Sequence, residues 1–210
     1  MSKITAIRTG RTQRKRVNMF LDGQFAFSLE SSVVAQEKLH VGQELTCETI
    51  EALGQSDKID RCYNAAIHYL SYRPRSTYEI RERLHRRGFD GNTAKAVIEK
   101  LMQQGLVDDI AFAQFWIDNR ESFSPRSKKL TGLELRKKGI AADIIDQVVG
   151  GIDENESAYQ AAVSKANRLP RSDYKLFRRR LTDFLKRRGF DYTLINHTVQ
   201  QVWQELEEGG

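Results

Sequence analysis

The chain has 210 residues, of which 40% are hydrophobic and 30% charged, and its formal net charge is +6. This length allows one or two domains with a hydrophobic core, and the positive charge favours polyanionic partners. Two cysteines form no disulfide framework, no apolar run reaches membrane-spanning length and the start lacks the apolar segment of a signal peptide, so we expect a cytoplasmic protein.

The pattern of the first 54 residues predicts a small α+β module. Residues 17–21 and 25–29 are β-prone runs, and Asp22-Gly23 between them is a strong hairpin signal because both turn residues must adopt positive φ. Residues 4–8 are a candidate third strand, and residues 30–38 have the pattern of a short helix. A further helix through residues 51–53 would join this module to the rest of the chain.

The remainder of the chain is built from repeats. Every proline lies in a Pro-Arg-Ser tripeptide, at residues 74–76, 125–127 and 170–172. Each tripeptide is followed by three cationic or potentially cationic residues, a glycine and an apolar residue, and the glycines are Gly88, Gly139 and Gly189. Two signatures that recur in order at one period indicate three tandem copies of one unit. We assign the module to residues 1–54 and the repeats to residues 55–107, 108–152 and 153–210.

Apolar spacing predicts three helices in each repeat. Counted from the glycine, apolar residues stand four before and one, ten and thirteen after, which is the spacing of one helix face. A preceding helix is expected over residues 62–72, 110–120 and 157–168; the proline then marks a turn, and the serine after it is a good N-cap. The predicted fold is mainly α, with three tandem three-helix repeats in an elongated, curved array after a small β-rich module.

The basic triplets before the glycines have two interpretations. Lys and Arg in a last helical turn stabilise the helix dipole and its free carbonyls, and glycine commonly follows, so each triplet alone is explained structurally. Three triplets at equivalent positions of a stacked array would instead form a cationic edge suited to a phosphate backbone or an acidic protein surface. Further cationic rows are Arg75, Arg126 and Arg171, and then Arg81, Arg83, Arg178, Arg179 and Arg180.

Aromatic residues are interleaved with these charges. Phe112 and Trp116, four apart on one predicted helix, are expected in the core. Five others are candidates for stacking on unpaired bases, although most of them fall at the spacing of core positions. These five are Tyr72, Tyr78, Phe123, Tyr174 and Tyr192.

The sequence gives little support for catalysis, a cofactor or a metal. The four histidines have no local His or Cys partner at metal-ligand spacing, and there is no phosphate-binding glycine loop or nucleophile elbow. The acidic pair Asp108-Asp109 is a conceivable nuclease feature. It stands immediately before a predicted helix, however, where carboxylates cap the N-terminus, and we favour the cap.

Several motifs resemble the RecX family of recombination regulators. Residues 69–80, YLSYRPRSTYEI, resemble the opening of that family's first repeat. Residues 101–120 resemble its central signature through Leu101, GLVDD at 105–109, Phe112-Ala113, Trp116 and Arg120, and residues 134–140, ELRKKGI, are similar to its second-repeat motif. The resemblance covers about residues 58–206. The third copy departs most, with five extra residues between Pro170 and Gly189.

This resemblance implies a non-enzymatic regulator, typically an inhibitor, of the RecA recombinase. Family members are nine-helix, crescent-shaped proteins that lodge in the groove of the RecA–DNA filament and inhibit its ATP hydrolysis, strand exchange and co-protease activity. It therefore implies a role in homologous recombination, DNA repair and the SOS response, with no cofactor or metal. We expect a monomer whose partners are the RecA filament and single- or double-stranded DNA.

The alternative function is a stand-alone DNA-binding protein, because three-helix units with a glycine turn can resemble helix-turn-helix modules. In either case we expect cations of the two repeated signatures to contact the filament or DNA. They are Arg73, Arg75, Arg86, Arg87, Arg126, Arg136, Lys137, Lys138, Arg187 and Arg188.

Overall fold

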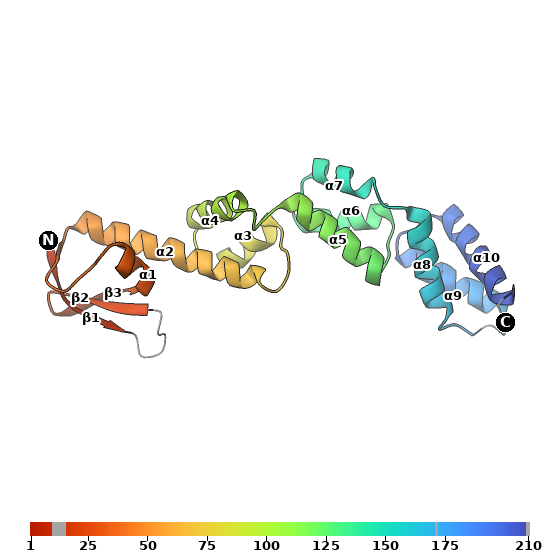
Figure 1. Cartoon of the computed structure of the whole chain (residues 1–210). Coiled ribbons are helices and arrows are strands. Elements are labelled where there is room, and N and C mark those ends of the chain that lie inside the picture. Colours follow the sequence, from red (N-terminus) through yellow and green to blue (C-terminus); the bar gives the residue numbers. More distant parts are fainter. Residues whose placement is uncertain (10–15, 171, 209–210) are drawn as a thin grey trace. The chain divides into compact units, whose positions relative to one another are not determined.

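The computed structural model describes residues 1–9, 16–170 and 172–208 (Figure 1). It divides into two compact units, of which the first comprises Met1–Arg73 and Ile80–Gln104 and the second Pro74–Glu79 and Gly105–Gly210. The described residues form ten helices and four strands, so the predicted mainly helical fold with a small N-terminal strand module is confirmed. None of these helices is both long and apolar enough to cross a membrane.

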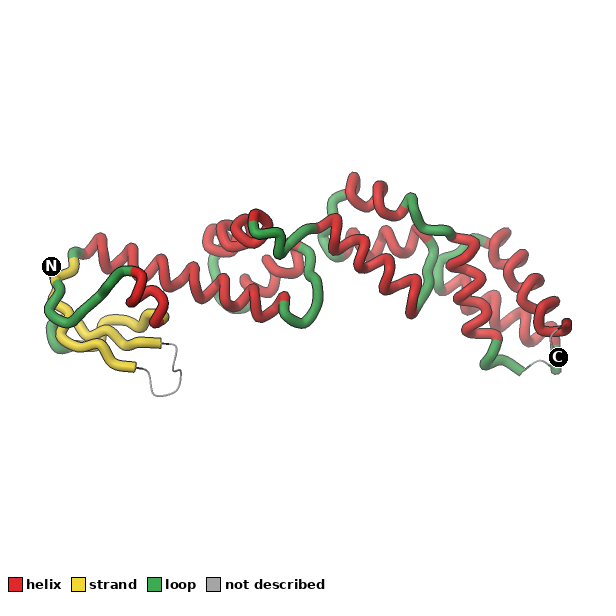
Figure 2. Tube along the Cα trace, in the orientation of Figure 1, coloured by secondary structure: helices red, strands yellow, loops and turns green. Residues whose placement is uncertain are grey.

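The N-terminal strands form one antiparallel sheet in the order β3-β2-β1-β4. The strands are drawn in yellow in Figure 2. The predicted hairpin is present, and Asp22 and Gly23 have φ values of 50° and 85° in its turn. The short fourth strand was not predicted. The apolar side of the sheet packs with Val33 of the short helix α1 and with Leu53 of α2. The elements are β1 (Ser2–Thr9), β2 (Arg16–Leu21), β3 (Gln24–Glu30), α1 (Ser31–Gln36), β4 (Glu44–Leu45) and α2 (Cys47–Leu70).

A single helix, α2, joins the sheet to the first repeat. The sequence predicted two separate helical segments here, whereas α2 runs without interruption for 24 residues. Its Asp57 is buried, and the carboxylate accepts hydrogen bonds from the backbone N–H of Glu30 (2.9 Å) and from Arg16 Nη2 (3.2 Å). Since a buried carboxylate must be neutralised and hydrogen-bonded, these contacts fix α2 against β2 and β3.

The helices of the repeats end as the glycine pattern predicts. Gly88, Gly139 and Gly189 have φ values of 85°, 76° and 87°, and each follows the end of a helix. The N–H of the next residue bonds to a carbonyl five positions back, for example Phe89 N to Leu84 O at 3.2 Å, which is the Schellman arrangement. The repeat helices are α3 (Thr77–Arg86), α4 (Gly91–Gln103), α5 (Asp109–Phe123), α6 (Lys128–Lys137), α7 (Ala142–Val149), α8 (Glu154–Ala166), α9 (Tyr174–Arg187) and α10 (Tyr192–Glu208).

The third repeat differs from the other two at the start of its middle helix. Ser127 caps α6 as predicted, but α9 is capped by the Asp173 carboxylate, so the N-cap prediction for Ser172 is wrong. Twelve residues before the glycine stand Ser76, Ser127 and, in the third copy, Phe177. Phe177 is fully buried inside α9, which has 14 residues against 10 in α6. The five extra residues therefore extend α9 at its N-terminal end.

Candidate functional site

The two repeated signatures contact each other in the second unit. Ser76 Oγ donates a hydrogen bond of 2.7 Å to the carbonyl oxygen of Lys138, and the backbone N–H of Ser127 donates one of 3.0 Å to the carbonyl oxygen of Arg188. In both cases the serine of one copy meets the residue that precedes the glycine of the next copy. We call these two contacts, Ser76–Lys138 and Ser127–Arg188, the repeat joints.

The glycines at the repeat joints are also in close contact. A Cβ atom on Gly139 would lie 2.3 Å from Tyr78 Cβ, and one on Gly189 would lie 2.5 Å from Ser127 Oγ. At Gly88 a Cβ atom would meet nothing within 4 Å. Gly139 and Gly189 are therefore required both by their positive φ and by close approach, whereas Gly88 is required by φ alone.

The third cation of each joined triplet stabilises the joint. Lys138 Nζ donates to Glu79 Oε1 at 2.7 Å, and Arg188 Nη1 donates to Ser124 Oγ at 2.7 Å and to the Pro125 carbonyl at 3.0 Å. Burial lowers the pKa of Arg188, and repulsion from neighbouring arginines lowers it further. These two predicted site residues are thus occupied by contacts within the protein.

Arg126, another predicted site residue, is also engaged internally. Its guanidinium pairs with the carboxylate of Glu134, which accepts hydrogen bonds from Arg120 Nε (2.7 Å) and Trp116 Nε1 (2.9 Å) as well. Glu134, which lies on α6, therefore accepts donors from α5 and from the loop that follows α5. Such a part-buried network orders the second repeat and leaves little of the Arg126 charge for a partner.

The remaining predicted cations differ in exposure. Arg73 and Arg75 are half-buried, whereas the other five are exposed at the ends of α3, α6 and α9. Arg86 makes a long ion pair of 3.9 Å with Glu82. In the second and third repeats the first two cations of the triplet are exposed and the third is in the joint. The exposed five are Arg86, Arg87, Arg136, Lys137 and Arg187.

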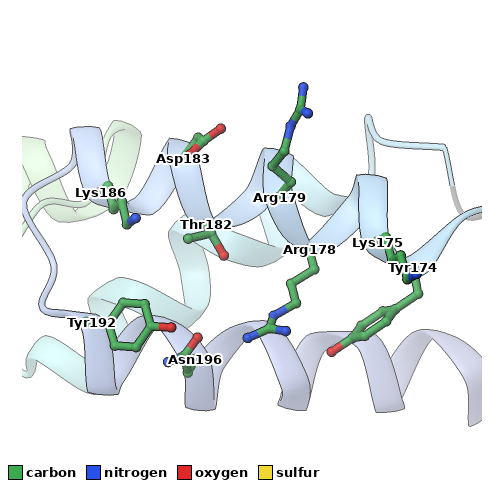
Figure 3. Close-up of a pocket in the computed structure, with 9 residues that line it drawn as sticks. All are labelled: Tyr174, Lys175, Arg178, Arg179, Thr182, Asp183, Lys186, Tyr192 and Asn196. Carbon is green, nitrogen blue, oxygen red and sulfur yellow. The ribbon is translucent and has the colours of Figure 1, made fainter.

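The structure assembles a second cationic site that the sequence did not predict as one unit. An open groove of about 540 Å³ lies between α9 and α10 (Figure 3). On α9 its residues recur at spacings of three and four, so they share one helix face. The sequence named some of them separately, as members of an arginine row and as stacking candidates. The lining residues are Tyr174, Lys175, Arg178, Arg179, Thr182, Asp183, Lys186, Tyr192 and Asn196.

The aromatic residues are distributed differently from the expectation. Phe112 is in the core as predicted, and Trp116 packs against that core while remaining partly buried. All five stacking candidates are exposed, from 41% for Tyr174 to 81% for Phe123, so the expectation that most of them occupy core positions is wrong. Helical spacing of three and four describes any one face of a helix, and it does not distinguish the buried face from the exposed one.

The acidic pair before α5 is accounted for by local structure. Asp108 is the N-cap and accepts from the backbone N–H groups of Ile110 and Ala111, as predicted. The Asp109 carboxylate accepts from the backbone N–H and the hydroxyl of Thr77, at 2.8 and 2.7 Å. Across the described ranges, no group of three or more His, Cys, Asp or Glu side chains could hold a metal ion.

Four segments of the chain match models of RecX domains. Residues 2–46 match the regulatory protein RecX N-terminal domain, and residues 62–101, 108–149 and 153–199 match the first, second and third three-helix domains of RecX. The chain belongs to the RecX family. The RecX models cover most of the sheet module and parts of all three repeats, which include the five exposed cations and all nine groove residues.

Curated relatives and solved structures show the same relationship. The regulatory protein RecX of Lactobacillus johnsonii (strain CNCM I-12250 / La1 / NCC 533) is 29% identical over 99% of this chain and 78% of its own length. That of Clostridium botulinum (strain Alaska E43 / Type E3) is 27% identical over 96% and 97%. A crystal structure of regulatory protein RecX gives a TM-score of 0.68 at 25% identity, over 93% of this chain and 98% of that one. The crystal structure of RecX from Lactobacillus salivarius gives a TM-score of 0.59 at 27% identity, over 70% of this chain and 97% of that one.

Proposed function

We propose that this protein is a non-enzymatic regulator, typically an inhibitor, of the RecA recombinase. It would bind along the groove of the RecA–DNA filament and modulate ATP hydrolysis, strand exchange and co-protease activity. The observation that carries the proposal is the match to RecX domains over the sheet module and all three repeats, with relatives described as regulatory proteins. Such a protein would act as a monomer in the cytoplasm, in homologous recombination, DNA repair and the SOS response.

The exposed cations support a repetitive polyanionic partner. Arg136 and Lys137 in the second repeat and Lys186 and Arg187 in the third occupy equivalent positions, and all four are exposed. A filament of identical subunits on a phosphate backbone presents equivalent groups at intervals, so each repeat can make a similar contact. Several weak contacts made by one chain add by avidity, which favours the filament over isolated subunits.

The test is the ATPase rate of RecA assembled beforehand on single-stranded DNA. The protein is titrated well below the RecA concentration, and the titration is repeated at a higher DNA concentration. A filament regulator is expected to inhibit at substoichiometric amounts in both series. A stand-alone DNA-binding protein would inhibit only when it sequesters the DNA, and inhibition that disappears with excess DNA would refute the proposal.

A pair of charge variants makes this test specific. The double variant Arg136→Gln/Lys137→Gln removes two exposed cations of the second repeat and is expected to shift the inhibition curve to higher protein concentration. The matched control, Lys95→Gln/Lys129→Gln, removes two exposed cations that stand outside the triplets. Equal shifts for both variants would mean that only net charge matters, and the contribution of the triplet would be excluded.

A further inference from the structure

The two helices that line the α9–α10 groove pack against each other through a buried apolar cluster. Phe177, Leu181 and Leu185 of α9 pack with Ile195 and Val199 of α10 in one buried cluster. On α9, Arg178, Thr182 and Lys186 of the groove each follow one of these buried residues by one position, so they lie on the adjacent face of the helix. Figure 3 shows Tyr174, Arg178, Tyr192 and Asn196 in the space between the two helices, while Arg179 and Asp183 point away from α10.

The groove carries an excess of uncompensated positive charge. Four cations, Lys175, Arg178, Arg179 and Lys186, face a single carboxylate, Asp183. Within the described ranges none of the four forms an ion pair, in contrast to Lys138 at its joint. Lys175 and Arg179 stand four apart on one helix, where like charges repel and destabilise the helix. This like-charge pair therefore does not stabilise the helix, whereas an anionic ligand would be attracted to the cluster.

Two exposed tyrosine rings flank these cations. Tyr192 is 62% exposed, and its ring centroid lies 5.8 Å from Lys186 Nζ. Tyr174 is supported from behind by Trp203, with ring centroids 5.0 Å apart, and Trp203 in turn packs on Phe177 at 4.9 Å. Tyr174 is thus held in place while part of its ring remains accessible. Exposed rings beside cations are how proteins bind single strands, because bases stack on the rings while cations neutralise phosphates.

This combination is confined to the third repeat. Counted from the repeat glycine, the first and second copies have Gly91 and Ala142 where the third has Tyr192. The position of Tyr174 is outside the middle helix in those copies, and only the additional N-terminal turn of α9 brings a ring there. The departure of the third copy from the repeat pattern therefore coincides with the formation of the groove.

We propose that the α9–α10 groove binds a single strand of nucleic acid, with phosphates on Arg178, Lys186 and the neighbouring cations and unpaired bases against Tyr174 and Tyr192. Thr182 and Asn196 supply neutral hydrogen-bonding groups on the floor. The inference rests on the proposed function, since it assigns the DNA strand of the filament to one site. An acidic protein surface would satisfy the cations, but it would give no role to the two exposed rings.

The experiment measures binding of the full chain to a fluorescent oligothymidylate, without RecA, by anisotropy. Tyr192→Ala and Arg178→Gln are each expected to raise the Kd about tenfold, and Tyr192→Phe is expected to retain affinity because the ring remains. Arg178→Gln is also expected to lower the slope of log K against log salt concentration by about one. The controls are Phe25→Ala and Arg168→Gln, exposed residues outside the groove, which should leave the Kd unchanged.

Three results would overturn the proposal. Equal binding of a duplex of the same length, with equal losses in the variants, would show phosphate contacts without base stacking. Unchanged oligothymidylate binding in the groove variants, with weakened binding to the RecA filament, would assign the groove to the recombinase protein. Equal losses in the groove variants and the controls would show that the groove has no particular role.

The ATPase titration of the wild-type chain separates this inference from the proposed function. If the groove variants lose oligothymidylate binding while the wild type fails to inhibit RecA, the groove assignment stands and the regulatory function fails. If the wild type inhibits RecA but the groove variants bind oligothymidylate normally, the opposite holds.

Discussion

Ser76 Oγ donates a hydrogen bond of 2.7 Å to the carbonyl oxygen of Lys138, a residue 62 positions further along the chain. Ser76 Oγ also accepts a hydrogen bond of 3.1 Å from the backbone N–H of Glu79, so one hydroxyl both caps α3 and contacts the end of α6. Ser76 is fully buried, which leaves no access for water to replace either bond.

Ser76→Ala is therefore expected to destabilise the protein by about 2 kcal/mol, because it removes an N-cap and leaves the Lys138 carbonyl without this donor. Urea unfolding of the two proteins measures the difference. Ser122→Ala, at an exposed position of α5, is the matched control and should change stability by less than about 0.5 kcal/mol. Similar losses of unfolding free energy in both variants would show that the Ser76 hydroxyl does not stabilise the joint.

The repeat glycines offer a second comparison. Gly88→Ala introduces a side chain at positive φ in open space and is expected to cost about 1 kcal/mol. Gly139→Ala adds a clash with Tyr78 to the same backbone strain and is expected to cost about 1–3 kcal/mol more. Thermal unfolding of the two variants decides the matter, and equal losses would show that the joint yields to an added methyl group.

Neighbouring cations of one triplet are expected to behave differently. Lys138→Gln removes the ammonium that binds the half-buried Glu79 and should cost about 1–2 kcal/mol of stability. Lys137→Gln should leave stability within about 0.5 kcal/mol and weaken binding to the RecA filament instead. Unfolding and filament binding are measured on both variants. The division of the triplet is incorrect if Lys137 carries the stability and Lys138 the binding.

The two cysteines should differ in reactivity. Burial, and to a smaller extent the Asp90 carboxylate, raise the pKa of the Cys62 thiol to about 11, although Lys58 opposes them. At pH 8 roughly one thiol in a thousand is therefore ionised. Because the thiolate is the reactive form, iodoacetamide at pH 8 should label the exposed Cys47 and spare Cys62. Mass spectrometry of the native and the urea-unfolded protein shows this. Equal labelling rates in the native state would contradict it.

Features set by adjacent residues could be predicted from the sequence. The Asp22-Gly23 turn and the glycine helix ends depend on φ values and on hydrogen bonds spanning five residues or fewer. The repeat joints connect residues about sixty positions apart. The periodicity revealed both signatures, but it could not show that the serine of one copy contacts the glycine turn of the next.

The candidate site shows the same limit. Lys137 and Lys138 are identical in type and adjacent in sequence, and only the position of Glu79 decides that one is internal and the other exposed. The groove was missed because its two rings come from different helices, and because Phe177 occupies the position of the N-cap serines. The longer spacing between Pro170 and Gly189 was visible in the sequence. Only the structure shows that the extra residues lengthen α9 and so place Phe177 at that position.

The replacement of the capping serine by Phe177 also makes the two ends of the repeat series unequal. Each joint needs a serine from one copy and a closely packed glycine from the next, and the second copy supplies both. A gene duplication of the second copy would therefore insert a unit that fits its neighbours on either side. A unit added after the third copy would meet Phe177 instead of a serine, so it would lack the hydrogen bond that forms each of the two joints.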